Sequence, residues 1–574
     1  MKKLKKIVMS AVVSMLVFST CSLSMVGLKT EAKTKESSKI TASQQYAEDM
    51  QPGWNLGNSF DSFDTNGDKG ETSWGNPVVT KSLIDKIKSQ GFKSIRIPFT
   101  SVMRTGVAPT YTIDPAFLAR YAEVVKWALD DGLYVMINLH HDSWSWASAI
   151  GSPSDNGASL EKYKAIWTQL ADYFKNYSNK VCFESLNEPQ FYTGDTSNQI
   201  KILEQVNSAF YNIVRNSGGK NAARMLVLPT LNTNDSDDRC ESLYNTITSL
   251  KDKNIIATFH YYGYWPFSTN IAGSTTMDST VTSALDGAFD RMYNHFTANG
   301  IGVICGEYGL LGFDKSEDTL EHGEMLKYFD YINYYAKAKK ITLMLWDNGN
   351  ILNRSNLTWY DQSLYDTIRS SWKGRNSYSS SDRIYVTDAS KAQDISTAII
   401  LNGNKLKSIH NGDKKLKLGR DYTYSNGTVT FKGSYINSLI TNSYGVNATL
   451  TIRFSHGADW TVYINHYKTP TLASADGTTS GFNIPVSFNG SRLSTLEAMY
   501  TDGSGAGPQN WTTYKEYNYA FKVNYDLNQV TMTDKFFAET KDGTILLKLH
   551  FQSGEVLQYN IIKNGTSVTG TLEN

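Results

Sequence analysis

The sequence predicts an α/β protein, a (β/α)8 TIM barrel followed by two small β-sandwich modules. Between about residues 53 and 375, short apolar runs alternate with amphipathic helical stretches. Polar side chains that could react stand where the apolar runs end. After residue 382 the helical pattern nearly vanishes, and Asn-Gly and Asp-Gly pairs mark a series of turns. With 574 residues, the chain has room for about two to four domains.

The amino-terminal residues 1–32 are predicted to be a secretion signal. Lysines precede an apolar stretch that is too short to span a bilayer comfortably, and cleavage is expected near Ala32. Lipid attachment at Cys21 is the weaker alternative, because the residues before it form a poor lipid-attachment motif. We therefore expect a secreted, extracellular protein.

Composition and charge exclude several classes of partner. Removing residues 1–32 takes away five lysines and one glutamate, which turns the net charge of +1 slightly negative. A nucleic-acid or membrane-surface partner is therefore not expected. The three remaining cysteines are too few and odd in number for a disulfide framework. Aromatic residues make up 12% of the chain, which suits a flat, partly apolar ligand, and we expect a monomer.

Eight apolar runs predict the eight strands of the barrel, in a domain that spans residues 40–375. Helical stretches with apolar residues at three- and four-residue spacing separate them, as at 115–132 and 161–178. A doubly wound open sheet is the competing architecture, but residues 53–58 lack the Gly-rich phosphate turn it would need. The predicted strands are residues 53–58, 94–99, 134–141, 181–188, 225–232, 255–262, 302–309 and 341–348.

Two β-rich modules are predicted after the barrel. The sequence NSYSSSD at 376–382 has the composition of a short polar linker. Residues 383–466 alternate like strands, and YTYSNGTVTF at 422–431 is a clear hairpin signal. Residues 467–574 form a second module with its own turns, including one expected at Asp476-Gly477.

The ends of the predicted barrel strands are rich in polar side chains. Active sites of such barrels lie at the carboxyl ends of the strands. One polar strand end commonly just faces water, but so many on a single rim indicate a site. These residues are Arg96, His140, His141, Asp142, Asn187, Glu188, His260, Tyr262, Glu307, Tyr308, Trp346, Asp347 and Asn348.

Two of these residues are carboxylates that can face each other across the barrel mouth. Glu188 follows the fourth predicted strand and Glu307 lies in the seventh. Cleavage of a glycosidic bond needs such a pair, since one group must deliver a proton while the other attacks the anomeric carbon. Pro189 would help to fix the direction of the Glu188 side chain.

The neighbouring residues suit supporting roles in that chemistry. Arg96 and Tyr262 could hydrogen-bond one carboxylate, and His260 could tune the other. Asn187 could hold the sugar 2-hydroxyl, and Trp346 could form a stacking floor for a sugar ring.

A metal-dependent hydrolase is the alternative for the same rim. His140, His141, Asp142 and His260 could serve as metal ligands. However, no His-x-His pair closes the first strand, and no lysine stands among the strand ends to bridge two ions. We therefore expect no metal ion and no cofactor.

The motifs SIRIP, NLHHD, SLNEP, HYYGYW, CGEYG and LWDNG, in this order, resemble glycoside hydrolase family 5. SWGNP and WDNG resemble its subfamily 4, which is mostly endo-acting on β-1,4-glucans. The resemblance covers residues 40–375 and implies a retaining mechanism, with Glu188 as acid/base and Glu307 as nucleophile. It implies supporting catalytic roles for Arg96, His140, Asn187, His260 and Tyr262. Substrate contacts are assigned to His141, Trp346 and Asn55.

The two carboxyl-terminal modules also resemble known companions. Residues 394–424 resemble the immunoglobulin-like module often found beside cellulase domains, where a spacer role is expected. Residues 481–503 and 507–521 resemble carbohydrate-binding module family 46. Trp511 follows a turn-like GPQN, so we expect an exposed stacking platform for glucan, with a core tryptophan as the alternative.

These predictions describe a secreted, retaining endo-β-1,4-glucanase whose partner is a β-glucan polysaccharide. A xyloglucanase, lichenase or mannanase on the same site remains the alternative within the enzyme class. A non-catalytic carbohydrate-binding protein is the alternative from another class, and the presence of both glutamates argues against it.

Overall fold

The computed structural model describes residues 40–313, 316 and 318–572. The predicted signal at residues 1–32 lies outside the described residues. Within the described part of the chain, no helix combines the length and the apolarity that a membrane crossing needs.

Eight parallel strands close into a barrel in the order β1 to β8, as predicted. Strand β8 pairs with β1 through Gly53 and Met344, which completes the ring. Seven of the eight strands end one to four residues before the predicted position, because their polar ends already belong to the loops of the mouth. The strands are β1 (Gly53–Asn55), β2 (Ser94–Phe99), β3 (Tyr134–Leu139), β4 (Val181–Glu184), β5 (Leu226–Pro229), β6 (Ile255–Tyr261), β7 (Gly302–Tyr308) and β8 (Ile341–Leu345).

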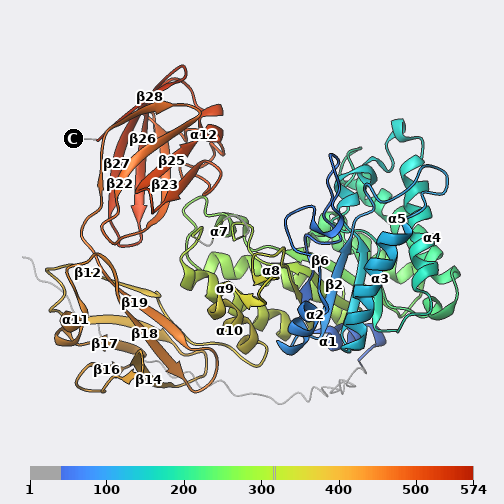
Figure 1. The fold of residues 1–574 in the computed structure, drawn as a ribbon, viewed down its shortest axis with the longest axis horizontal. Coiled ribbons are helices and arrows are strands. Elements are labelled where there is room, and N and C mark those ends of the chain that lie inside the picture. The colour runs from blue at the N-terminus through green and yellow to red at the C-terminus, as the bar shows by residue number, and fades with distance from the viewer. Residues whose placement is uncertain (1–39, 314–315, 317, 573–574) are drawn as a thin grey trace, which may run out of the picture. The chain divides into compact units, whose positions relative to one another are not determined.

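Helices run along the outside of the barrel (Figure 1). The Asp114 side chain accepts hydrogen bonds from backbone N–H groups in the first turn of α3. Proline is tolerated at the first position of this helix, because an N–H group there would have no partner within the helix. Gly91, Gly132 and Gly300 follow helical segments with φ of +101°, +77° and +81°, conformations that favour glycine. The helices are α1 (Ala42–Met50), α2 (Lys81–Ser89), α3 (Pro115–Asp130), α4 (Ala158–Phe174), α5 (Thr196–Asn216), α6 (Asp237–Leu250), α7 (Trp265–Ser268), α8 (Ser279–His295), α9 (His322–Ala338) and α10 (Gln362–Ser371).

The inside of the barrel is built in two layers. An apolar floor joins the strands to Ala47 and Met50 of α1, which closes the amino-terminal end of the barrel. Two residues further along the strands, the inward positions become polar, because alternate strand residues face the same side. The floor contains Met136, Cys182, Val227, Ile256, Ile304 and Met344. The buried polar layer above it contains Asn55, Arg96, Asn138, Glu184 and Thr258.

The second module consists of a four-stranded sheet, β11-β13-β17-β16, and a five-stranded sheet, β12-β19-β18-β14-β15. The predicted hairpin is confirmed as β16 and β17, which pair across Asn426 and Gly427, both with positive φ. A short helix, α11 (Gly433–Leu439), was not predicted. The strands are β11 (Tyr378–Ser379), β12 (Arg383–Val386), β13 (Ile395–Ile400), β14 (Leu406–Asn411), β15 (Lys414–Lys415), β16 (Tyr422–Ser425), β17 (Thr428–Phe431), β18 (Gly445–Phe454) and β19 (Trp460–His466).

The prediction of a polar linker at 376–382 is wrong. Its strand β11 pairs with β13, and Asn376 and Asp382 are buried. Asn376 donates to the Asp330 carboxylate, and Asp382 accepts from the backbone N–H of Gly323 at the start of α9. The polar side chains of this segment form hydrogen bonds with buried partners. Composition alone cannot show whether a polar side chain is buried in this way or exposed to water.

The third module has nine strands around its own apolar core. Eight of them form one hydrogen-bonded path, β23-β26-β27-β28-β21-β22-β25-β24, and β20 pairs with β22 beside it. The turn expected at Asp476-Gly477 is wrong, because both residues lie inside β21. A Cβ at Gly477 would come within 3.0 Å of the Phe482 ring, so close packing accounts for this glycine. The elements are β20 (Thr471–Leu472), β21 (Ala475–Thr478), β22 (Gly481–Ser487), β23 (Leu493–Tyr500), β24 (Phe521–Asn524), β25 (Gln529–Thr533), α12 (Asp534–Ala538), β26 (Gly543–Phe551), β27 (Val556–Asn564) and β28 (Ser567–Leu572).

Candidate active site

Glu188 and Glu307 lie close together at the carboxyl end of the barrel. Glu307 belongs to β7 and is buried, whereas the Glu188 side chain is 25% exposed. One oxygen of each glutamate and a nitrogen of His260 all lie within 4.8 Å of one another. Glu188 has a left-handed backbone with φ of +36° directly before Pro189, a strained conformation of the kind that collects at functional sites. The sequence SLNEP therefore directs a carboxylate into the mouth.

Arg96 connects the polar layer of the barrel to Glu307. Its Nη1 donates to Glu307 Oε1 at 2.6 Å, and its Nε donates to Glu184 Oε2 at 2.7 Å. Its Nη2 donates to Asn187 Oδ1 at 2.8 Å. Burial alone would lower the pKa of Arg96, but the charges of Glu184 and Glu307 raise it above its ordinary value. A permanently charged, planar fork thus fixes two oxygens of the mouth at once.

Asn55, which the sequence analysis assigned to a substrate contact, lies inside the barrel. It is fully buried, and its Nδ2 donates to the backbone oxygen of Gly306 at 2.9 Å. Its Oδ1 accepts from Arg96 Nη1 at 3.0 Å. Asn55 ends its strand in the polar layer below the mouth, where it holds the arginine in place.

His260 and Tyr262 bond the two glutamates from β6 and the loop that follows it. His260 Nδ1 lies 3.1 Å from Glu188 Oε1 and 3.6 Å from Glu307 Oε2. The Tyr262 hydroxyl donates to Glu307 Oε2 at 2.6 Å. Burial lowers the pKa of His260, but the charge of Glu307 and the bond to Glu188 outweigh it and raise that pKa. These contacts match the supporting positions expected from the sequence.

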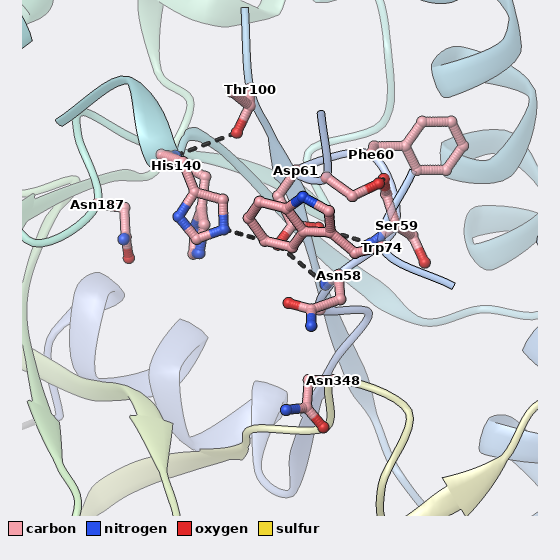
Figure 2. Close-up of polar contacts among 12 residues, drawn as sticks. Asn58, Ser59, Phe60, Asp61, Trp74, Thr100, His140, Asn187 and Asn348 are labelled. Carbon is pink, nitrogen blue, oxygen red and sulfur yellow. Dashed lines mark hydrogen bonds and ion pairs between the residues drawn. The ribbon is translucent and has the colours of Figure 1, made fainter. Parts of the chain in front are cut away.

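The adjacent histidines His140 and His141 have different surroundings. His140 stacks parallel to Trp346, with ring centroids 5.6 Å apart, and its Nε2 lies 3.8 Å from Glu307 Oε1. Burial, followed by the neighbouring charges, holds the pKa of His140 well below its ordinary value, so it is neutral near pH 7. His141 Nε2 instead lies 3.2 Å from Asp61 Oδ2. Figure 2 shows His140, Asp61 and Asn187 around the mouth.

Two tryptophans that the sequence analysis did not assign to the site flank His141. The rings of Trp74 and Trp144 lie 4.9 Å and 4.6 Å from the His141 ring, and they are 41% and 49% exposed. Figure 2 labels Trp74 in the same close-up as Asp61 and His140. Trp74 belongs to the SWGNP motif, and Trp144 comes three residues after His141, so proximity along the chain was the available signal. Together these rings form an exposed aromatic surface around His141.

Several polar strand ends serve the fold rather than the mouth. Asp142 is buried and accepts from Ser101 and Trp146. Asp347 is buried and accepts from Trp54 Nε1 and from backbone N–H groups of the following loop. These carboxylates hold the loops that surround the site.

Glu184 and Asn138 are parts of the site that the sequence analysis missed. Asn138 Nδ2 donates to Glu184 Oε2 at 2.8 Å, the same oxygen that Arg96 contacts. Both residues face the barrel interior one strand repeat below the mouth. A charged residue inside an apolar strand run was the signal that could have found Glu184.

Trp511 of the third module is 60% exposed, as expected, and not part of a core. Its ring centroid lies 6.1 Å from that of Trp265, which begins α7 after β6. The buried Lys515 Nζ donates to the backbone oxygens of Pro508 and Thr512, at 3.0 Å and 2.8 Å. The loop that carries Trp511 is therefore fixed from within.

Comparison with known families agrees with this geometry. The sequence model described as cellulase (glycosyl hydrolase family 5) matches residues 57–351. The chain belongs to glycosyl hydrolase family 5. Models of two carbohydrate-binding domains, X2 and family 46, match residues 378–464 and 468–571. Both modules of this family 5 enzyme therefore belong to sequence families described as carbohydrate-binding domains.

Several relatives match nearly the whole length of this chain. Endoglucanase B of Paenibacillus lautus is 49% identical over 535 residues, which cover 92% of this chain and 94% of that protein. The structure of the full-length tri-modular endo-β-1,4-glucanase B of Bacillus halodurans aligns with a TM-score of 0.90 and 45% identity, over 93% of this chain and 100% of that one. A tri-modular subfamily 4 endo-β-1,4-glucanase of Bacillus licheniformis, complexed with cellotetraose, aligns with a TM-score of 0.78 and 30% identity, over 90% and 99% of the two chains.

Proposed function

We propose that this family 5 enzyme is a retaining endo-β-1,4-glucanase that cleaves cellulose-type polysaccharides by double displacement. The observation that carries the proposal is the pair Glu188 and Glu307, with oxygens within 4.8 Å of each other. Retaining enzymes hold their two carboxyl groups about 5–5.5 Å apart, whereas inverting enzymes separate them by about 6.5–9.5 Å to admit a water molecule. The close pair supports direct attack by one carboxylate.

In the first step, Glu188 gives its proton to the glycosidic oxygen while a carboxylate oxygen of Glu307 attacks the anomeric carbon. The glycosidic bond breaks, and the leaving chain departs with a new hydroxyl. In the second step, Glu188 takes a proton from water, whose oxygen attacks the same carbon and breaks its bond to Glu307. Two inversions give net retention. Glu188 is the more exposed of the two, as an acid/base that meets water must be.

The surrounding residues orient these groups. Arg96 and Tyr262 each hold one oxygen of Glu307, which leaves the carboxylate no freedom to turn away. Asn187 Nδ2 is buried and has no hydrogen-bond partner among the described residues, so it can donate to a sugar 2-hydroxyl. The stacked pair of His140 and Trp346 forms the floor beneath the sugar.

The aromatic side chains define a path for a long substrate. Trp74 and Trp144 are exposed beside the mouth, and each can stack on a sugar ring. Trp511, next to Trp265, supplies a further exposed ring on the third module. We assign β-glucan binding to these rings, while the second module serves as a spacer.

We also propose the boundaries and the location of the protein. Residues 1–32 form a cleaved signal, 40–375 the catalytic domain, 383–466 the immunoglobulin-like module and 467–574 the carbohydrate-binding module. The lysine-rich, then apolar, start of the chain supports secretion. A long polysaccharide is accessible only outside the cell, where the protein acts as a monomer without nucleic-acid or membrane partners.

A reducing-sugar assay tests the proposal. The mature protein is compared with Glu307→Gln and Glu188→Gln on carboxymethylcellulose, barley β-glucan, xyloglucan, xylan and mannan. We expect the mature protein to hydrolyse the β-1,4-glucans. Each substitution should abolish this activity and leave polysaccharide binding intact. Activity that survives Glu307→Gln contradicts the proposed mechanism. A preference for xylan or mannan contradicts the proposed specificity for β-1,4-glucan.

A further inference from the structure

Asp61 is a fully buried carboxylate on the loop that follows β1. Its Oδ1 accepts from the backbone N–H of Ser59 at 2.7 Å, and its Oδ2 accepts from the backbone N–H of Asn58 at 2.9 Å (Figure 2). Asn58 has a left-handed backbone with φ of +55°, a conformation that asparagine tolerates in tight turns. Two backbone donors thus fix both oxygens of the Asp61 side chain.

The same carboxylate also bonds the ring of His141. Asp61 Oδ2 lies 3.2 Å from His141 Nε2, and because a carboxylate only accepts hydrogen bonds, this nitrogen carries a proton. The other ring nitrogen, Nδ1, is buried and has no partner among the described residues. The backbone N–H of His141 donates to Thr100 Oγ1 at 3.1 Å. Asp61 therefore sets the tautomer of His141 and the direction of its ring.

The His141 ring lies between the two exposed tryptophans of the mouth. It is tilted by 45° against both Trp74 and Trp144, and its centroid lies within 5 Å of each of their ring centroids. Only 5% of the His141 side chain is exposed, so most of its surface contacts protein. Because protein interiors are closely packed, an imidazole that turned would displace the rings that contact it.

We propose that Asp61 is a positioning residue for substrate binding, which acts by fixing the His141 ring. That ring sets the angle and the separation at which Trp74 and Trp144 meet the sugars of a β-glucan chain. The inference rests on the proposed function, in which the two tryptophans stack on the substrate. It adds a buried residue that acts on the substrate only through those rings. Rings that are ordered before the substrate arrives lower the entropy cost of binding.

Asp61 is connected to the aromatic surface and not to the reacting groups. The Glu307 carboxylate is held by Arg96 and Tyr262, whereas Asp61 bonds His141. Stacking rings away from the reacting bond contact the substrate and the transition state alike. Loss of their order should therefore raise KM and leave kcat nearly unchanged.

Steady-state kinetics of Asp61→Leu on a soluble β-glucan provide the first test. Leucine has a similar shape but no acceptor, so His141 loses its bond. We expect KM to rise roughly 2- to 10-fold, as for a lost stacking ring, with kcat within about twofold of the unsubstituted protein. An unchanged KM in the folded variant, or a fall in kcat alone, overturns the proposal.

Asp61→Asn is the conservative variant that separates positioning from stability. The amide can still bond His141, because an imidazole nitrogen either donates or accepts, but its NH2 group faces a backbone N–H at one of the two oxygen positions. Thermal unfolding should show that both substitutions lower stability. KM should rise in Asp61→Leu and recover in Asp61→Asn. A KM that rises equally in both variants indicates a structural role and overturns the proposal.

The matched control is Asp330→Leu in α9. Asp330 is also fully buried, and it accepts from the backbone N–H of Asn376 at 2.8 Å, but it has no contact with the aromatic surface in the described part of the chain. This substitution should lower the unfolding temperature and leave KM unchanged. A raised KM here would show that loss of stability alone affects binding, and it would remove the support that Asp61→Leu gives.

A mutant cycle tests whether Asp61 acts through the two tryptophans. In a protein with Trp74→Ala and Trp144→Ala, the rings that His141 orients are absent. Adding Asp61→Leu should then change KM by less than about twofold, because residues that act through one another are not additive. A full further rise in KM in this background overturns the proposal.

Structural measurements separate this inference from the proposed function. Nitrogen NMR of the neutral His141 ring should find the proton on Nε2 in the unsubstituted protein, whatever the enzyme binds. A crystal structure of Asp61→Leu should show a turned His141 ring and displaced tryptophans. Rings that stay in place overturn the positioning role itself. Displaced rings with an unchanged KM instead contradict the proposed stacking of β-glucan on Trp74 and Trp144, and the inference fails with it.

Discussion

The barrel mouth and the Trp511 loop present functional side chains in opposite ways. At the mouth, Arg96 and Glu307 are buried, and bonds from several strands fix them. In the third module, Trp511 is exposed on a loop, and the buried Lys515 holds that loop through backbone oxygens. The charged groups of the mouth are oriented where water is excluded. The Trp511 ring instead remains accessible to solvent, and only Lys515, which holds its loop, is buried.

The difference follows from what each region must do. Charges act more strongly on a reacting bond in a dry, preorganised site than in water. A ring that binds a polymer gains from contact area and must remain reachable. Substitutions at the mouth should therefore affect turnover on every substrate, and substitutions in the loop should affect long substrates alone.

The largest effect is expected for Arg96→Met. Glu184 would be left as a buried charge without its cation, which costs about 3–5 kcal/mol of unfolding free energy, and turnover should be lost. Denaturant unfolding measures the loss of stability, and the reducing-sugar assay measures the loss of turnover. Arg96→Lys keeps the charge but not the fork, so it should regain stability more than activity. Full activity in Arg96→Lys contradicts the role given to the fork.

Glu184→Gln should have the next largest effect. The side chain keeps its shape, but Arg96 loses one of its two anionic partners and can move relative to Glu307. We expect kcat to fall roughly 10- to 100-fold with little change in KM. Steady-state kinetics on a soluble β-glucan measure this split, and a change in KM alone would place Glu184 among the binding residues.

Trp511→Ala should have a smaller effect, confined to polymers. Loss of one stacking ring costs about 0.5–1.5 kcal/mol, so KM on polymeric glucan should rise roughly 2- to 10-fold. Turnover of a short aryl cellobioside should stay unchanged. Trp144→Ala, next to His141 at the mouth, is the comparison, and it should raise KM for both the polymer and the short substrate. If Trp511→Ala leaves binding and hydrolysis of polymers unaltered, the third module does not use this ring.

Lys515→Met should act in the same direction as Trp511→Ala and no more strongly. Methionine keeps the apolar stem, but the bonds to the loop oxygens are lost, so the loop gains freedom that binding must remove. Polymer KM is the measurement. A combined Trp511→Ala, Lys515→Met variant should be no worse than Trp511→Ala, and additive losses would show that Lys515 acts elsewhere.

The sequence predicted the barrel and the centre of its site because both depend on local patterns. Apolar runs gave the strands, and Glu188, Glu307, Arg96 and His260 stand at or near their ends. The sequence did not show how deep in the barrel each polar side chain lies. Asn55 was therefore assigned to substrate although it lies one layer below the mouth.

Contacts between distant segments were also hidden from sequence reasoning. Asp61 meets His141 across 80 residues, and no spacing rule connects them. Glu184 and Thr258 point inward from strands whose register is fixed only when the barrel closes. The segment 376–382 was misread because its polar side chains are buried by partners far along the chain.

The most direct test of the account is to trap the covalent intermediate on Glu307. A 2-deoxy-2-fluoro cellobioside with a good leaving group should react once and then hydrolyse slowly, since fluorine destabilises the second transition state. Peptide mapping by mass spectrometry should find the sugar on the peptide that contains Glu307, and the label should be absent from Glu307→Gln. Attachment to another residue, or an inverted product without any label, would contradict the double displacement proposed for this enzyme.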